Sequence, residues 1–167
     1  MVSEDLSELF KEYCVLARMT AVRINQWVDL VSEFLIRLEA DLPEIQHTFR
    51  ISHPGKVVEA EPGLSDPHCD GRTVIIVTCE TGFKLVYKPK SMGLEKEYFE
   101  LCAWLNSRGE NILPFKIVNV INRGSYGWVE YVEHLPMENK EEITRYFQTS
   151  GMLLCLIYAF DGIDFHS

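Results

Sequence analysis

The stretch TVIIVTCETGFKLVYK, residues 73–88, decides how the middle of this chain folds. Its first part, 73–79, is rich in β-branched residues, which favour strands. The Glu-Thr-Gly segment at 80–82 indicates a turn. The last part, 84–88, alternates polar and apolar residues with a period of two, which is typical of a strand with one buried face. The stretch therefore predicts a β-hairpin.

The segments after the hairpin alternate between helix and strand. Residues 92–106 carry apolar side chains at helical spacing, so we expect one helix directly after the hairpin. Two further strands are expected at 115–121 and 126–132, on either side of a turn that contains glycine. A last helix is expected from Asn139 to about Phe160.

The residues before position 44 predict a helical hairpin. Ser3 suits the start of a first helix, and Thr20 suits the start of a second helix that ends near Pro43. Packing of the two helices as neighbours within the chain is expected, and a short coiled coil is the alternative. The predicted buried stripe of the second helix consists of Ala21, Ile24, Val28, Val31, Leu35 and Leu38.

The order of these elements predicts an α+β fold in three parts. A helical hairpin at 1–43 precedes a small antiparallel sheet with one inserted helix at 44–134. Residues 135–167 would begin a second lobe with the helix 139–160, which leads into a loop with an acid. This layout is that of protein-kinase-like folds, so the middle part is predicted to be a kinase-like N-lobe.

The composition predicts a globular protein that does not bind nucleic acid. With 16 Lys and Arg residues against 25 Asp and Glu residues, the net charge of −9 repels phosphate backbones. The five cysteines are odd in number and scattered, which predicts reduced thiols in a cytoplasmic protein. The N-terminus lacks the pattern of a signal peptide.

The longest apolar run, residues 152–160, is much shorter than the roughly 20 residues of a membrane-spanning helix. We therefore expect a buried helix there and no membrane span. If this helix were exposed, it could cause artificial self-association of the chain.

A lysine on the hairpin is the first residue that could carry chemistry. Phosphoryl transfer requires a cation on the nucleotide phosphates, and Lys88 ends a strand on the same face as Val86. The helix that follows bears Glu95, Glu97 and Glu100, one of which could hold the lysine as in kinases. The alternative is an ordinary solvated lysine at a strand edge, and from spacing alone Lys84 or Lys90 would serve equally.

Two polar segments are further candidates. Asp66, His68 and Arg72 lie in a turn before the first strand of the hairpin, where a solvated loop is the alternative interpretation. Neighbouring His and Cys residues without a second pair do not make a tetrahedral zinc site, so no zinc is expected. Near the C-terminus, Asp164 and His166 could act in acid–base chemistry, and a helix C-cap is the alternative there.

Five stretches together resemble one known family. In order, DPHCDGR (66–72), KLVYKPKSM (84–92), AWLN (103–106), YGWVEYVEH (126–134) and GMLLCLIYAFDGIDFH (151–166) resemble the N-terminal dehydratase domain of class II lanthipeptide synthetases, the LanM family. The resemblance implies a fold similar to lipid kinases. It also implies ATP- and Mg²⁺-dependent phosphorylation of Ser and Thr in a precursor peptide, followed by elimination of phosphate. A separate zinc-bearing cyclase domain of that family has no counterpart in this sequence.

The resemblance also implies roles for individual residues. The lysine of the family's V-Y-K-P motif matches Lys88, and the acid and histidine of its D-x-H-x-x-G-[RK] loop match Asp66 and His68. The family's D-x-H-x-x-N pattern begins at Asp164 and His166, and its asparagine is not present.

The remaining expected roles concern the nucleotide and the departing phosphate. Glu95 fits best as the partner of Lys88, and Arg72 is a candidate for the elimination step. The segment 130–134 would link the two lobes, with Glu130 and Val132 near the adenine and Val86 on the lysine's face.

The resemblance leads us to expect the front part of a larger enzyme, cut at the catalytic loop. The expected partners are the precursor peptide and the remainder of the same synthetase chain. On its own, the 167-residue piece is expected not to turn over ATP. The alternatives are the N-lobe of a small-molecule or lipid-type kinase and a noncatalytic, peptide-binding remnant.

Overall fold

The computed structural model of the chain describes residues 2–66, 70–109 and 113–162. It divides into two compact units, one formed by Met1–Met92 and Asn119–Tyr131, and the other by Gly93–Val118 and Val132–Ser167. Each unit is described below by itself.

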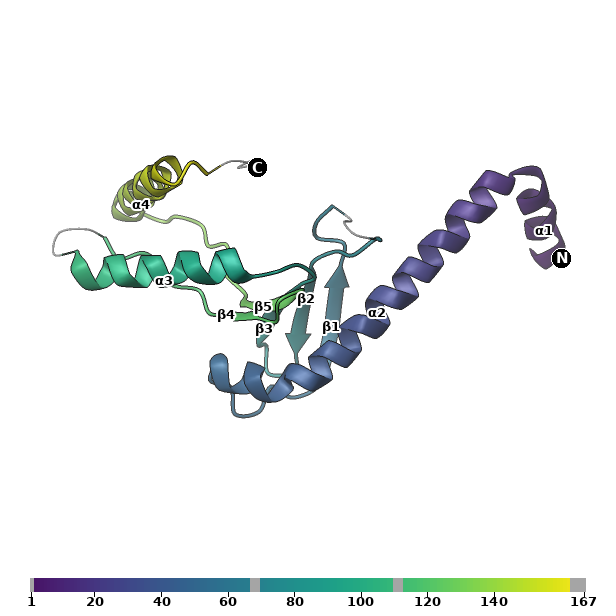
Figure 1. Cartoon of the computed structure of the whole chain (residues 1–167), viewed down its shortest axis with the longest axis horizontal. Coiled ribbons are helices and arrows are strands. Elements are labelled where there is room, and N and C mark those ends of the chain that lie inside the picture. Colours follow the sequence, from purple (N-terminus) through teal and green to yellow (C-terminus); the bar gives the residue numbers. More distant parts are fainter. Residues whose placement is uncertain (1, 67–69, 110–112, 163–167) are drawn as a thin grey trace. The chain divides into compact units, whose positions relative to one another are not determined.

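The first unit combines two helices with a five-stranded antiparallel sheet (Figure 1). Its strands follow the order β1-β2-β3-β5-β4 across the sheet. This architecture confirms the predicted α+β class, and the hairpin predicted at 73–88 is present as β2 and β3. The elements of the unit are α1 (Val2–Glu12), α2 (Cys14–Thr48), β1 (Val57–Pro62), β2 (Ile75–Cys79), β3 (Lys84–Lys88), β4 (Val120–Asn122) and β5 (Gly127–Glu130).

Strands β2 and β3 have one buried face and one half-buried face, as the period of two predicts. In β2, Ile75, Val77 and Cys79 are buried and alternate with half-buried residues. In β3, Leu85 and Tyr87 are buried, and Tyr87 stands opposite Trp128 of β5 in the strand register. In β2 and β3, only one of the two faces therefore belongs to the hydrophobic core.

The core lies between the buried face of the sheet and the C-terminal half of α2. Figure 1 shows this blue part of the helix beside the strands. The Phe34 ring meets the Tyr87 ring edge-on, with centroids 5.5 Å apart, and lies 6.2 Å from the Trp128 ring. Clusters of aromatic rings bury large areas and add specific geometry to the packing. The buried residues of this cluster are Leu30, Phe34, Ile45, Ile75, Val77, Leu85, Tyr87, Ile121 and Trp128.

The boundaries predicted for the first two helices are wrong in two places. The break between them lies at Tyr13 and not at Thr20, which is in the interior of α2. Threonine costs less than about 1 kcal/mol in a helix interior, so it does not end a helix by itself. Although Pro43 lacks the N–H for one helical hydrogen bond, α2 continues to Thr48 because Asp41 and Ile45, on either side of it, are both buried.

The predicted buried stripe of α2 is also wrong. Ile24, Val28 and Leu35 are exposed, and only Leu38 of the predicted set packs against the core. The face that meets the sheet instead carries charged side chains among its apolar ones, and these have partners on the strands. An apolar pattern alone cannot identify such a face.

The second unit contains α3 (Gly93–Arg108) and α4 (Lys140–Ala159). The predictions of helices at 92–106 and 139–160 are confirmed within two residues, and the Asn139 side chain caps α4 by accepting from the Glu142 N–H at 2.9 Å. The strand predicted at 115–121 shrinks to β4. Phe115, the first residue of the predicted strand, lies outside β4. Its backbone instead exchanges two hydrogen bonds with the Asn106 side chain, each 2.8 Å long.

The apolar run at 152–160 is helical but not buried. No residue of α4, which the structure describes in full, is buried, and Leu154 and Tyr158 are largely exposed. The expectation of a buried helix is therefore wrong. Within the described part of the chain, no helix is both long and apolar enough to cross a membrane.

Candidate functional site

The half-buried face of the sheet carries Lys88 at one end of β3. Lys88 lies opposite Gly127 of β5, and it shares its face with Val86 because β3 alternates. A side chain at position 127 would collide with the Ile121 carbonyl oxygen and with Met92. The absence of a side chain at Gly127 therefore lets Met92 and the Ile121 carbonyl group lie close to β5 at the position opposite Lys88.

The same face has an apolar centre. Val86 pairs with Ile76 of β2 on one side and with Val129 of β5 on the other. Thr78 lies two residues after Ile76 in β2, and its hydroxyl is buried without a hydrogen-bond partner among the described residues. At the other end of β3, the Lys84 ammonium lies 5.2 Å from the centre of the Tyr131 ring. The face thus combines an apolar floor with a cation at each end of one strand.

Sequence analysis did not identify Ile76 and Val129 as part of this face. The sequence pattern could have revealed both residues, because strand pairing places one residue of each neighbouring strand directly beside Val86 on the same face.

The predicted linker residues are divided between the two units. Glu130 ends β5, and its Oε2 accepts hydrogen bonds from the Asn119 backbone N–H at 3.2 Å and from Asn119 Nδ2 at 2.9 Å. Val132 belongs to the second unit and is exposed. Glu95 opens α3 in the second unit, so its pairing with Lys88 stays a prediction.

The polar turn before β2 is held against α2. Asp66 is exposed at its start, and Asp70 and Gly71 at its end both have positive φ angles of 68° and 87°. Arg72 then donates to Glu33 of α2, from Nε to Oε2 at 3.1 Å and from Nη2 to Oε2 at 2.8 Å. The hydrogen bond to Glu33 raises the pKa of the Arg72 guanidinium above its usual value. Arg72 is thus a fixed cation with a structural partner.

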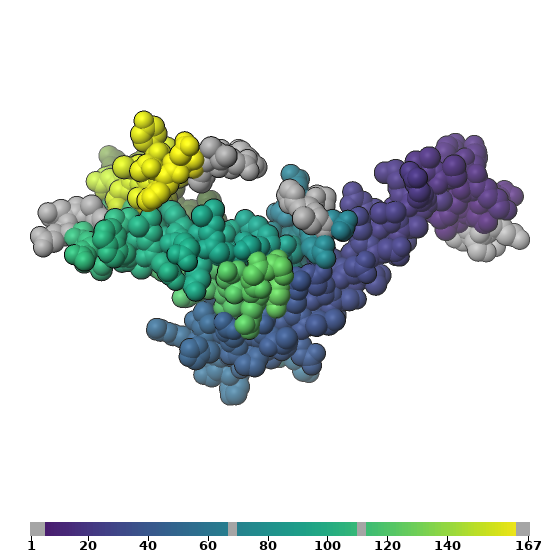
Figure 2. Space-filling model, in the orientation of Figure 1, coloured from purple at the N-terminus to yellow at the C-terminus, as the bar shows by residue number. Residues whose placement is uncertain are grey.

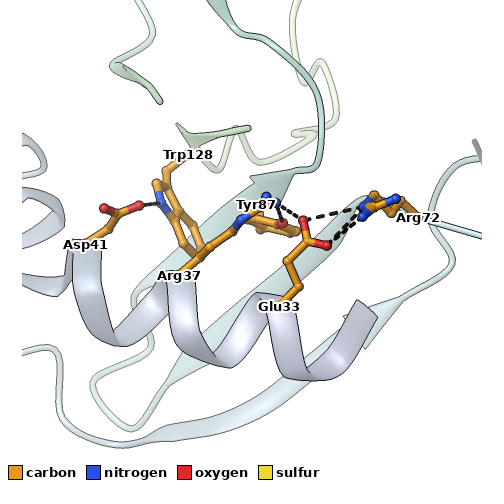
Figure 3. Close-up of polar contacts among 6 residues, drawn as sticks. All are labelled: Glu33, Arg37, Asp41, Arg72, Tyr87 and Trp128. Atoms are coloured by element: carbon orange, nitrogen blue, oxygen red, sulfur yellow. Dashed lines mark hydrogen bonds and ion pairs between the residues drawn. The ribbon is translucent and has the colours of Figure 1, made fainter. Parts of the chain in front are cut away.

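Glu33 is one of three charged residues spaced four apart on α2 that reach the sheet (Figure 3). Glu33 also pairs with Arg37, and Arg37 Nη1 donates to the Tyr87 hydroxyl at 2.6 Å. The Arg37 guanidinium lies 4.0 Å from the centre of the Tyr126 ring. Burial raises the pKa of the Tyr87 phenol, although the hydrogen bond from Arg37 acts in the opposite direction.

Asp41 is the third member of this series and is almost fully buried. Its Oδ2 accepts from Trp128 Nε1 at 2.7 Å, and its Oδ1 pairs with Arg123 Nη2 at 2.8 Å. Sequence analysis missed Glu33, Arg37 and Asp41, because a charged series on a helix usually faces solvent.

A polar hollow of about 330 Å³ lies between the turn and α2. Its lining mixes charges of both signs, so it is not a site for an anion alone. The lining residues are Val22, Asn25, Gln26, Asp29, Leu30, Asp70 and Arg72. Across the described ranges, no group of three or more His, Cys, Asp or Glu residues could hold a metal ion.

Three predicted site residues, His68, Asp164 and His166, lie outside the described residues. Their expected roles in the polar turn and in the catalytic loop stay predictions.

Two comparisons place the chain among known proteins. Residues 13–167 match the model of the family described as Domain of unknown function (DUF4135). The chain is also similar to the lacticin 481/lactococcin biosynthesis protein LcnDR2 of Lactococcus lactis subsp. lactis, with 28% identity over 156 residues. That match covers 86% of this chain but only 16% of the relative's length. The chain therefore belongs to the DUF4135 family, and its resemblance to class II lanthipeptide synthetases is confirmed.

Proposed function

We propose that this chain provides the nucleotide-binding sheet of a lanthipeptide dehydratase. The complete enzyme would phosphorylate Ser and Thr of a precursor peptide with ATP and Mg²⁺, and then eliminate phosphate to leave a dehydroamino acid. We assign this reaction to a longer cytoplasmic synthetase, since the chain matches only 16% of the length of its lantibiotic-biosynthesis relative.

One observation carries the proposal. Lys88 ends β3 on the sheet face that α2 does not cover, beside an apolar floor formed by Val86 and Val129, and α3 follows directly in the sequence. A flat apolar surface suits a nucleotide base, and a lysine at its edge suits phosphates. The sheet order with a helix inserted between β3 and β4 supports a kinase-like N-lobe.

Each proposed role follows from the chemistry of the side chain. Lys88 neutralises phosphate charge, with Glu95 as its proposed partner, and Asp164 orients the substrate hydroxyl with help from His166. Bound Mg²⁺ would supply charge neutralisation at the phosphates. Glu130 and Val132 would lie near the nucleotide base.

Elimination is a different step and needs different groups. A base removes the proton on the α carbon, the C–H electron pair forms the new C=C bond, and the C–O bond to phosphate breaks with its electrons leaving on phosphate. Asp66 and His68 are proposed to take part in the removal of this proton, and Arg72 is proposed to stabilise the departing phosphate.

The test uses the complete synthetase with a precursor peptide from the same organism. Mass spectrometry should detect phosphorylated and dehydrated peptide with the wild-type enzyme. Lys88→Met is expected to slow both by on the order of 100-fold, because a fixed cation at the phosphates is lost. Lys84→Met is the matched control, since Lys84 lies on the same face at the other end of β3, and it should keep near wild-type rates.

Wild-type rates in Lys88→Met would overturn the proposal. Turnover of ATP with a small alcohol but never with the peptide would indicate a small-molecule kinase instead. Peptide binding without ATP turnover would indicate a noncatalytic remnant.

A further inference from the structure

The Glu33 carboxylate on α2 contacts the polar turn that precedes β2. Arg72 meets Glu33 side-on, through Nε and Nη2 together, and this geometry fixes the plane of a guanidinium as well as its position. The contact is partly shielded from water, since the Glu33 and Arg72 side chains are 20% and 33% exposed.

The backbone of the turn is docked on the same helix. A Cβ atom at position 71 would lie 3.0 to 3.2 Å from the side chain of Gln26, so a larger residue would require that side chain to shift. Gly71 also has a φ of 87°, a conformation that L-residues with side chains rarely adopt. The turn thus reaches α2 by close backbone approach one residue before the Arg72–Glu33 pair.

The same carboxylate is connected to β3. Glu33 pairs with Arg37, whose Nη1 donates to the hydroxyl of Tyr87 at 2.6 Å (Figure 3). Tyr87 is fully buried and directly precedes Lys88 in the strand. A fully buried ring cannot shift without disturbing the core, so Tyr87 is a rigid end point for this connection.

We propose that Glu33 is a positioning residue of the dehydratase, which sets Arg72 relative to Lys88 through the contacts Arg72–Glu33–Arg37–Tyr87. This inference rests on the proposed function. Glu33 does not touch the substrate, and its effect passes through the arginine that it orients. The helix α2 is then a support for the phosphate site, although it lies on the opposite face of the sheet.

The two half-reactions should depend on Glu33 to different degrees. Phosphoryl transfer relies on Lys88, which is held by its own strand. Departure of phosphate relies on a cation in the right orientation, and displacement of such a group by about 1 Å can cost 100-fold in rate. Loss of Glu33 is therefore expected to slow elimination more than phosphorylation.

The experiment measures the ratio of phosphorylated to dehydrated precursor peptide made by the complete synthetase. Glu33→Gln keeps the size of the side chain and removes its charge, and it should raise the ratio by about tenfold or more. The double variant with Arg72→Ala should show the same ratio as Arg72→Ala alone, because both changes act through one group. Glu44→Gln is the matched control. Glu44 lies on the same helix as Glu33 and is paired with Arg123, which lies between β4 and β5, so breaking this ion pair should keep the wild-type ratio.

Compared at equal conversion of the precursor peptide, the ratio does not depend on how much enzyme is folded, so partial unfolding of a variant does not hide the result. A wild-type ratio in Glu33→Gln, or equal slowing of both steps, would show that Glu33 is only structural. If the wild-type enzyme makes neither product, the proposed function itself is wrong. Glu33→Asp, which keeps the charge but shortens the reach, should give a ratio between those of the wild type and Glu33→Gln.

Discussion

The two halves of α2 have similar helical patterns but opposite surroundings. From Leu30 to Ile45 the helix covers the sheet, and its charged residues are bonded to strand residues. The half before Leu30 exposes large apolar side chains, among them Met19, Ile24 and Trp27, and Figure 2 shows this part as an open surface in purple and violet. Apolar spacing therefore does not reveal which half of a helix has a partner.

Polar residues can mark a buried face of a helix when they have specific partners on the surface that covers it. Glu33 and Asp41 lie on the covered half, where Glu33 is bonded to Arg72 in the turn before β2 and Asp41 to Trp128 of β5. On the uncovered half, large apolar residues such as Met19 and Trp27 are exposed instead. The position of the interface on α2 therefore depends more on the bonding partners opposite the helix than on the hydrophobicity of the helix itself.

The largest expected effect separates the two halves directly. Phe34→Ala should lower the free energy of unfolding by about 3 to 5 kcal/mol, because Phe34 is 4% exposed and packs against Tyr87 and Trp128. Trp27→Ala removes a larger side chain that is 59% exposed, and it should change this free energy by less than about 0.5 kcal/mol. Urea denaturation followed by circular dichroism measures both. Equal losses would remove the distinction between the halves.

The second prediction tests the polar contacts of the covered half. Asp41→Ala should cost about 2 to 3 kcal/mol, because it leaves the buried Trp128 N–H without its acceptor. Glu44 is the other acidic partner of Arg123 and is much more exposed than Asp41. Glu44→Gln should therefore cost less than about 1 kcal/mol. If both variants unfolded at the same urea concentration, Asp41 would not be part of the interface.

The smallest effect concerns thiol reactivity. Cys14 begins the uncovered half of α2 and is exposed, whereas Cys79 is buried on the core face of β2. Burial raises the pKa of the Cys79 thiol, so less thiolate is present at pH 8, and its alkylation should be slow and should increase only at higher pH. Iodoacetamide labelling with peptide mapping should modify Cys14 and Cys155 first. Early labelling of Cys79 would show that the covered region opens readily.

Much of the fold could be predicted because its signals are local. The hairpin of β2 and β3 follows from alternation and a turn, and α3 follows from apolar side chains at helical spacing. The face of Lys88 was predicted for the same reason, since a strand places every second side chain on one side. The candidate motifs also led to the confirmed family resemblance.

The errors share a cause, which is that partners distant in sequence were unknown. Pro43 looks like a helix boundary only if the helix has nothing to pack against there, and the buried Asp41 and Ile45 lie on either side of it. Phe115 left its expected strand because Asn106 bonds to its backbone.

The local elements, the family and the strand face on which Lys88 lies can all be predicted from the amino-acid sequence, because they depend on residue types and spacing among near neighbours. That Glu33, Arg37 and Asp41 face the sheet became visible only in the folded chain (Figure 3). The reason is physical: a charged side chain can be buried at low cost only where a specific partner meets it. Those partners come from strands up to 87 positions away along the chain.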